Sequence, residues 1–217
     1  LLAMKLSKHE TPDERQVAKA LILGLGYQMG WVRLSGELLK GMLGTKPVLF
    51  GEKERARYAI DVSEFCSRPY GRDGRTNLDM ISTIKSRHTA DEMVVHCAVA
   101  DYLMRRYRKM AGKIAQSWKD ADRVLACMAE ERPDEAPGAV RMTWGPLKVL
   151  RGSLVKPNGL ALHYPKLRKS ADGYTYRGGK SGREWVKAYG GLIVENVTQS
   201  LARDVVAEQA LWVRAAG

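Results

Sequence analysis

The sequence predicts an α+β fold in which helices dominate and a small antiparallel β-hairpin region follows them. Up to about residue 131, apolar residues recur at intervals of three and four, which is the spacing of one face of an α-helix. After the segment 133–138, which contains Pro and Gly, short β-forming runs alternate with turn residues. We therefore expect a helical part at residues 1–135 and a mixed part at residues 136–217.

The composition indicates a polyanionic partner. The chain of 217 residues has 36 Lys and Arg against 24 Asp and Glu, a formal net charge of +12, and is 45% hydrophobic. It can bury a core, and its charge favours nucleic acid over a membrane; a basic protein without such a partner is the alternative. No apolar run approaches membrane-spanning length. Three widely spaced cysteines fit buried thiols in a reducing compartment, so we expect a cytoplasmic location.

The first predicted helix covers residues 12–26. Thr11 is a suitable cap, Pro12 suits the first helical position, and Glu14 lies three residues after the cap, where it can reach back. Glycines near the end of this helix lower its stability, so we expect other atoms to approach its backbone closely there.

One stripe of this helix has the residue types that bind a nucleoside triphosphate. Arg15, Lys19, Leu23 and Tyr27 follow at intervals of four, which places them on one slowly drifting face. The two cations would meet the phosphates, Leu23 the sugar or base edge, and Tyr27 a base face. The alternative for the two cations is an ordinary solvated helix face.

A long helix is predicted over residues 89–119, and a further helix over residues 122–131. Thr89 and Glu92 form a capping-box pattern at the start of the long helix. Its polar side carries Arg105, Arg106, Arg108, Lys109 and Lys113. That run could follow a phosphate backbone, although such a run is more often a solvated face.

The second part is predicted to contain a hairpin region at residues 140–168 and a helix at residues 190–214. Between them, the polar and Gly-rich segment 170–184 is expected to be mobile when no ligand is bound. Asn196, Gln199 and Arg203 lie three and four residues apart on the last helix. Amide side chains there can read minor-groove base edges, and the alternative is a polar, hydrated helix face.

Four segments, in order, resemble family A DNA polymerases, the DNA polymerase I-like enzymes, and most closely the phage members. The pattern from Arg15 to Tyr27, with Leu-Gly-Leu-Gly-Tyr-Gln-Met-Gly at 23–30, is similar to their nucleotide-binding fingers helix. Tyr107-Arg108, Ile114 and Trp118-Lys119 resemble their long fingers helix. Residues 156–168 resemble the palm hairpin, and residues 189–204, which begin Tyr-Gly-Gly, resemble the palm helix.

The resemblance implies the fingers subdomain at 1–135 and part of the palm at 136–217, and a role in template-directed DNA synthesis from dNTPs. Arg15 and Lys19 would then be the catalytic residues that bind the triphosphate, and Leu23 would touch the incoming sugar. Tyr27 would stack near the templating base. In the family a Gly often follows this Tyr, whereas this chain has Gln28.

The resemblance also implies that Asn196, Gln199 and Arg203 hold the primer-template DNA. In the family, two Asp residues bind Mg²⁺, one on a strand before the fingers and the other on a strand just after the palm helix. Neither of the two strand patterns occurs in this chain. The Mg²⁺ ligands are therefore expected outside this chain, which holds no metal site of its own. We expect a fragment that is inactive alone.

Two other interpretations remain open. A single-subunit RNA polymerase shares an Arg/Lys/Tyr fingers helix, and ribose selection would distinguish it. A non-catalytic basic module that binds nucleic acid would explain the charge and the missing Asp pair, but not the apolar, Gly-containing end of the first helix.

Overall fold

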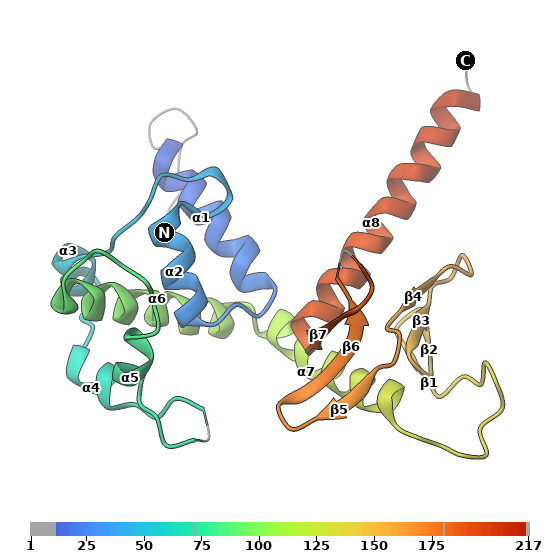
Figure 1. Cartoon of the computed structure of the whole chain (residues 1–217). Coiled ribbons are helices and arrows are strands. Elements are labelled where there is room, and N and C mark those ends of the chain that lie inside the picture. Colours follow the sequence, from blue (N-terminus) through green and yellow to red (C-terminus); the bar gives the residue numbers. More distant parts are fainter. Residues whose placement is uncertain (1–11, 72, 180, 216–217) are drawn as a thin grey trace. The chain divides into compact units, whose positions relative to one another are not determined.

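The computed structural model describes residues 12–71, 73–179 and 181–215, and it confirms the α+β class with two small antiparallel sheets. The chain divides into two compact units, residues 1–112 and residues 113–217 (Figure 1). The described part of unit 1 is helical. Unit 2 combines two long helices with both sheets.

Unit 1 is built around α6, Ala90–Met110. The preceding helices are α1 Pro12–Gly26, α2 Trp31–Lys40, the 3-10 helix η1 Met42–Gly44, α3 Glu52–Arg57, α4 Val62–Ser67 and α5 Asn77–Ile81. Each of α1 to α5 contacts α6. The α6 side chains of Cys97, Val99 and Leu103 are almost completely buried, so the core of unit 1 lies along this helix. α1 has the expected range, and its predicted cap at Thr11 lies outside the described residues.

The capping box predicted at the start of α6 is confirmed. The Thr89 hydroxyl accepts a bond from the Glu92 backbone N–H, and the Glu92 carboxylate accepts one from the Thr89 backbone N–H, at 3.3 and 2.9 Å. The expected continuation to residue 119 is wrong. Ala111, at φ −97° and ψ 45°, leaves the helical region, and α7 begins at Gly112. Glycine is a poor helix former, which makes this junction the weakest point of the predicted helix.

Helix α7, Gly112–Ala129, replaces the separate helix expected at residues 122–131. It forms the centre of unit 2, because Ala121, Val124, Leu125 and Met128 are fully or nearly fully buried in one apolar cluster with both sheets and the last helix. The boundary expected between residues 135 and 136 falls inside unit 2, since the apolar face of α7 packs on strands and a helix that come later in the chain.

The first sheet is an antiparallel meander in the order β1-β2-β3-β4. Its strands are β1 Met142–Trp144, β2 Leu147–Leu150, β3 Ser153–Val155 and β4 Ala161–His163. The hairpin region expected at residues 140–168 therefore contains four short strands. Val149 and Leu154, which are paired across β2 and β3, turn toward α7 and have no exposed surface.

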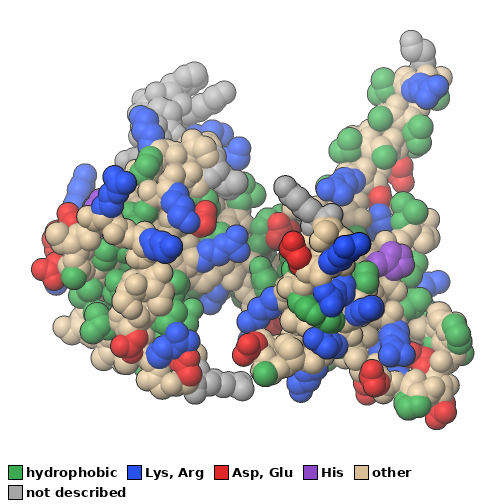
Figure 2. Space-filling view, viewed as in Figure 1, with side chains coloured by type: hydrophobic (Ala, Val, Ile, Leu, Met, Phe, Trp, Pro, Cys, Tyr) green, Lys and Arg blue, Asp and Glu red, His purple; other side chains and the backbone are tan. Residues whose placement is uncertain are grey.

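The second sheet lies where the sequence suggested a mobile segment. β5 Arg168–Ser170, β6 Gly173–Gly178 and β7 Glu184–Ala188 pair in that order, with β6 and β7 joined over five residue pairs. Lys and Arg side chains gather over these strands (Figure 2). The Tyr176 ring packs edge-on against Tyr164, with the ring centroids 5.2 Å apart, so the sheet is attached to the core of the unit.

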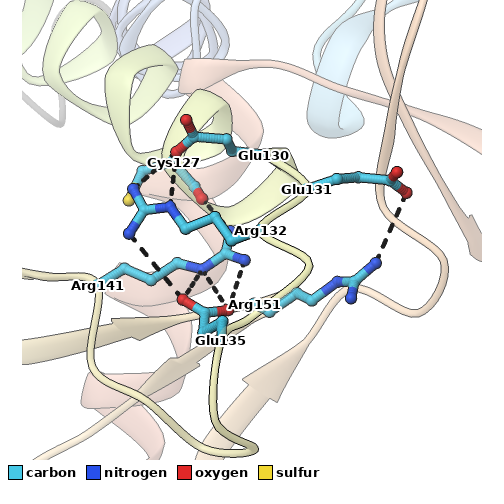
Figure 3. A network of polar contacts seen from close by, with 7 residues as sticks. All are labelled: Cys127, Glu130, Glu131, Arg132, Glu135, Arg141 and Arg151. Carbon is cyan, nitrogen blue, oxygen red and sulfur yellow. Dashed lines mark hydrogen bonds and ion pairs between the residues drawn. The ribbon is translucent and has the colours of Figure 1, made fainter.

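The segment after α7 is fixed by a buried ion pair (Figure 3). The Arg141 side chain has no exposed surface and donates to both carboxylate oxygens of Glu135, at 2.6 to 3.0 Å. It also donates to the Cys127 carbonyl at the end of α7. The hydrogen bonds from Arg141 hold the pKa of Glu135 below its usual value. A segment whose composition suggests a linker is thus tied to the helix.

Helix α8, Gly190–Ala215, has the predicted position and extends beyond both sheets of unit 2 (Figure 1). Its first half is packed on the core through Ile193, which is completely buried. Its second half exposes Val205, Val206, Leu211, Trp212 and Val213. Of the helices in the described ranges, none is both long and apolar enough to cross a membrane.

A buried histidine connects three elements of unit 1. His96 on α6 accepts a bond from the Phe50 backbone N–H at Nδ1, at 3.0 Å, and its Nε2 lies 3.2 Å from the Ser35 carbonyl of α2. The neutral ring with a proton on Nε2 satisfies both neighbours. Burial lowers the pKa of His96 from 6.5, because protonation would place a charge in the core and a donor against the Phe50 N–H.

We predict that His96 makes unit 1 less stable in acid. Since the folded pKa is lowered, the unfolded chain binds more protons below pH 6.5, so the free energy of unfolding falls as the pH decreases from there. The slope from this group reaches at most about 1.4 kcal/mol per pH unit. Urea unfolding of wild type and His96→Gln, compared between about pH 5 and 7.5, measures it. Gln supplies a donor and an acceptor without titrating, so identical slopes in the two proteins would contradict the prediction.

Candidate nucleotide and nucleic-acid sites

Helix α1 has one buried and one exposed face, and the predicted phosphate-binding residues lie on the exposed face. Ala20, Leu21 and Leu25 are at most 2% exposed and pack inward. Arg15 and Lys19 are exposed. Leu23 and its neighbour Ile22 are also open, at 41% and 46%. Arg15, Lys19 and Leu23 thus form one exposed stripe of two cations and one apolar side chain, which a ligand can reach.

Tyr27 does not continue this stripe as part of the helix. α1 ends at Gly26, and Tyr27 lies half-buried in the turn that follows, with its N–H bonded to the Gly24 carbonyl at 3.3 Å. The next residue, Gln28, has φ 66°, which is the left-handed region. A side chain there costs about 1–2 kcal/mol. This explains why a glycine suits the position after such a tyrosine.

The atoms that come close to the glycines of α1, as expected, belong to other side chains of the protein. A Cβ on Gly24 would lie 3.1 Å from the methyl carbons of Met29 and Met42. A Cβ on Gly26 would lie 3.4 Å from the Tyr107 hydroxyl of α6. The two glycines therefore let the end of α1 sit against its neighbours, and the outer face stays open.

The basic run of α6 does not form one continuous solvated face. Arg105 forms an ion pair with Asp101, with its Nε 2.9 Å from Oδ2, and Arg68 donates to the same oxygen at 2.6 Å. The Asp101 side chain between them is only 4% exposed. Arg108 turns toward the end of α1, where it donates to the Met29 carbonyl at 3.4 Å, and burial lowers its pKa. Two of the cations that were expected to follow a phosphate backbone, Arg105 and Arg108, therefore also make contacts within the fold.

On α8 the predicted DNA-binding residues share one face but differ in their contacts. Asn196 is half-buried and donates to the Tyr164 hydroxyl at 3.2 Å. Burial of that ring raises the pKa of Tyr164 to about 12, so the hydroxyl stays protonated. Gln199 is exposed and donates to Glu195 one turn earlier, at 3.1 Å. Arg203 is exposed, so it and Gln199 are the residues of the three that are most accessible to a partner.

The start of α8 is pressed against α7. A Cβ on Gly190 would lie 2.0 Å from the Trp118 carbonyl oxygen, so no other residue fits there without moving the backbone. The Gly190 N–H donates to the Asp122 carboxylate at 2.7 Å. This contact explains the first glycine of the Tyr-Gly-Gly sequence. It also fixes the direction in which α8 leaves the core.

A second anchor of α8 was not visible in the sequence. Lys156, next to β3, places its ammonium 2.7 Å from both carboxylate oxygens of Asp204, and the two side chains are 5% and 20% exposed. The pair joins residues 48 positions apart, so no local pattern predicts it. Asp204 is the residue after Arg203, so the ion pair sets the orientation of the part of α8 that carries Arg203.

The described residues do not fit a Mg²⁺ site. Within ranges 12–71, 73–179 and 181–215, no group of three or more His, Cys, Asp or Glu side chains is arranged to hold a metal ion. The buried carboxylate of Asp101 and the partly buried one of Asp204 each pair with a cation of the chain itself.

Comparison with known proteins gives no family. No protein-family model matches the chain, and no curated protein or solved structure matches it. Any function therefore has to be argued from the chain's own residues and contacts.

We predict that Asp204→Asn destabilises unit 2 by roughly 3 kcal/mol, since it leaves the buried Lys156 ammonium without a counter-charge. Urea unfolding followed by circular dichroism measures the change. Asp120→Asn is the matched control, because its partner Arg123 is 73% exposed and the pair contributes at most about 1 kcal/mol. Equal losses in the two variants would show that the Lys156–Asp204 pair is not an anchor.

Proposed function

We propose that the chain is the dNTP- and primer-template-binding part of a family A DNA polymerase, with fingers residues in unit 1 and part of the palm in unit 2. The observation that supports this most is the exposed stripe of Arg15, Lys19 and Leu23 on α1. The sequence resemblance assigns the nucleotide to these same three positions.

The role of each residue follows from its chemistry. Arg15 can present two parallel N–H donors to phosphate oxygens, and Lys19 is a compact point charge. Together they would hold the triphosphate and neutralise the charge that grows on the leaving pyrophosphate. The exposed Leu23 would provide apolar contact for the sugar. Tyr27, which lies in the turn just beyond the helix, would stack near the templating base.

Unit 2 would hold the primer-template. Gln199 can donate to the acceptors that every base pair presents in the minor groove, and Arg203 adds a positive charge next to it. Asn196 would hold the primer-template with them, and its bond to the Tyr164 hydroxyl ties the first half of α8 to the strand region. Gly190 and the Lys156–Asp204 pair keep the exposed residues on a rigid helix.

The proposal places the two-metal chemistry outside this chain. Mg²⁺ in such a reaction supplies electrostatic stabilisation of the reacting phosphate. The described carboxylates form no group that would hold it, and the roles proposed for this chain are binding, orientation and charge neutralisation by its own cations.

We predict that Lys19→Ala weakens dNTP binding by the full chain about 10- to 100-fold, the loss expected for one charged contact to phosphate. Arg15→Ala should give a loss of similar size. Equilibrium dialysis with radiolabelled dATP measures the affinity. Arg33→Ala on α2 removes another exposed cation of the same unit and should have little effect. If Arg33→Ala and Lys19→Ala bind dATP equally well, α1 is not the nucleotide site.

We predict that the double change Gln199→Ala and Arg203→Ala weakens binding of a primer-template duplex about 10- to 100-fold. A gel-shift titration at fixed salt measures it, with Arg123→Ala on α7 as the control for loss of one exposed charge. Binding of DNA without any dNTP affinity would favour the non-catalytic module over the polymerase. Unchanged DNA binding in the double variant would remove α8 from the proposal.

A further inference from the structure

The outer face of the β5–β7 sheet carries cations around one tryptophan. Arg177 pairs with Trp185 across β6 and β7, and Thr175 lies between Arg168 and Lys187 in the neighbouring row. Side chains alternate between the two faces of a strand, so these five residues point to the same side. We call them the Arg–Trp face.

The opposite side of this sheet is the one that packs inward. Ala188 is 2% exposed within the core of unit 2, and Tyr174 and Tyr176 pack against that core. The Arg–Trp face is therefore directed outward. Trp185 keeps 40% of its surface exposed, so a partner can reach it.

Both guanidinium groups lie over the tryptophan ring. The Arg168 Cζ is 3.8 Å and the Arg177 Cζ 4.3 Å from the ring centroid of Trp185. Arg177 is also held by a bond that it donates to the Arg183 carbonyl. Stacking of this kind orders an arginine while leaving most of its N–H donors available. The ring thus holds two positive, planar groups in place.

The positive charge of this face is not neutralised by the described residues of the chain. Among them, Arg168, Arg177 and Lys187 take part in no ion pair, whereas Arg68, Arg105 and Arg141 each contact a buried or nearly buried carboxylate. The register places no Asp or Glu on the outer side of β5, β6 and β7.

A hollow beside the face adds two more cations. Lys166, Arg177 and Arg183, with Pro165 and Gly182, line a volume of about 440 Å³. Arg177 belongs to both the hollow and the stack over Trp185. A chain of phosphates could therefore continue from one to the other.

We propose that the Arg–Trp face binds single-stranded nucleic acid. Exposed aromatic rings and guanidinium planes are surfaces on which unpaired bases stack, and neighbouring cations bind the phosphates. A duplex keeps its bases stacked inside and cannot use the planar groups. The surface uses none of the residues assigned on α1 or α8, so it goes beyond the proposed function.

The first test is a fluorescence anisotropy titration of the full chain with a labelled oligo-dT of about 20 nucleotides. Replacing Arg168 and Arg177 together by Gln should weaken binding about 10- to 100-fold, and lower the slope of log affinity against log salt by about 1.4, the value for two phosphate contacts on a single strand. The double change Arg123→Gln and Lys148→Gln removes the same charge from α7 and β2 and should stay within about threefold of wild type. If the two double variants bind alike, the proposal is wrong.

The second test addresses the stacking. Trp185→Ala should weaken oligo-dT binding about 5- to 100-fold, and Trp185→Phe should retain most of it, with circular dichroism as the check on folding. Wild type should bind an abasic oligonucleotide of equal length correspondingly more weakly than oligo-dT. Equal affinity for the two strands, or tighter binding of a duplex of the same length, would overturn the proposal. The titrations contain no free dNTP, and the variants leave Arg15 and Lys19 unchanged, so a failure of this proposal is distinguishable from a failure of the dNTP site on α1.

Discussion

Burial of one face of a central helix is the constraint on which each unit depends. In unit 1 the apolar side of α6 collects α1 to α5 around it, and in unit 2 the apolar side of α7 collects both sheets and the start of α8. Area removed from water supplies most of the free energy of such packing, at about 25 cal/mol per Å². The same packing fixes which side of α1 and of α8 is left exposed, and the candidate binding residues lie on those sides.

Several packings of these helices and strands could bury the apolar faces, and the buried polar groups select one of them. His96, Asp101, Arg141 and Lys156 each meet a partner that is distant in the sequence or fixed by a neighbouring element. An alternative packing would leave a buried charge or ring nitrogen unpaired, at a cost of several kcal/mol. Hydrophobic burial alone would allow one helix to slide along another. The buried hydrogen bonds and ion pairs prevent this, because sliding would break them.

The features that could be predicted from the sequence were local. α1, α8 and the capping box at Thr89 depend on residues within a turn or two of each other, and the exposed stripe of Arg15, Lys19 and Leu23 follows from helix periodicity. The break at Ala111 was missed because the apolar pattern continues through it. β6 and β7 were missed because their stability comes from pairing across strands, such as Arg177 with Trp185, which neither strand reveals alone. The internal partners of Asn196 and of Asp204 are equally non-local.

The cations of the chain fall into two groups, those paired inside the fold and those open to a partner. Some cations, such as Arg68 and Arg141, compensate carboxylates inside the fold and are largely covered, at 28% and 0% exposure of their side chains. Others, on α1, on α8 and on the Arg–Trp face, are exposed, and those of the Arg–Trp face have no carboxylate partner in the described parts of the chain. Only the exposed cations can displace counterions from a polyanion, so they, and not the net charge of +12, determine how steeply binding depends on salt. The number of phosphates that the chain can contact is therefore set by the exposed cations on α1, on α8 and on the Arg–Trp face.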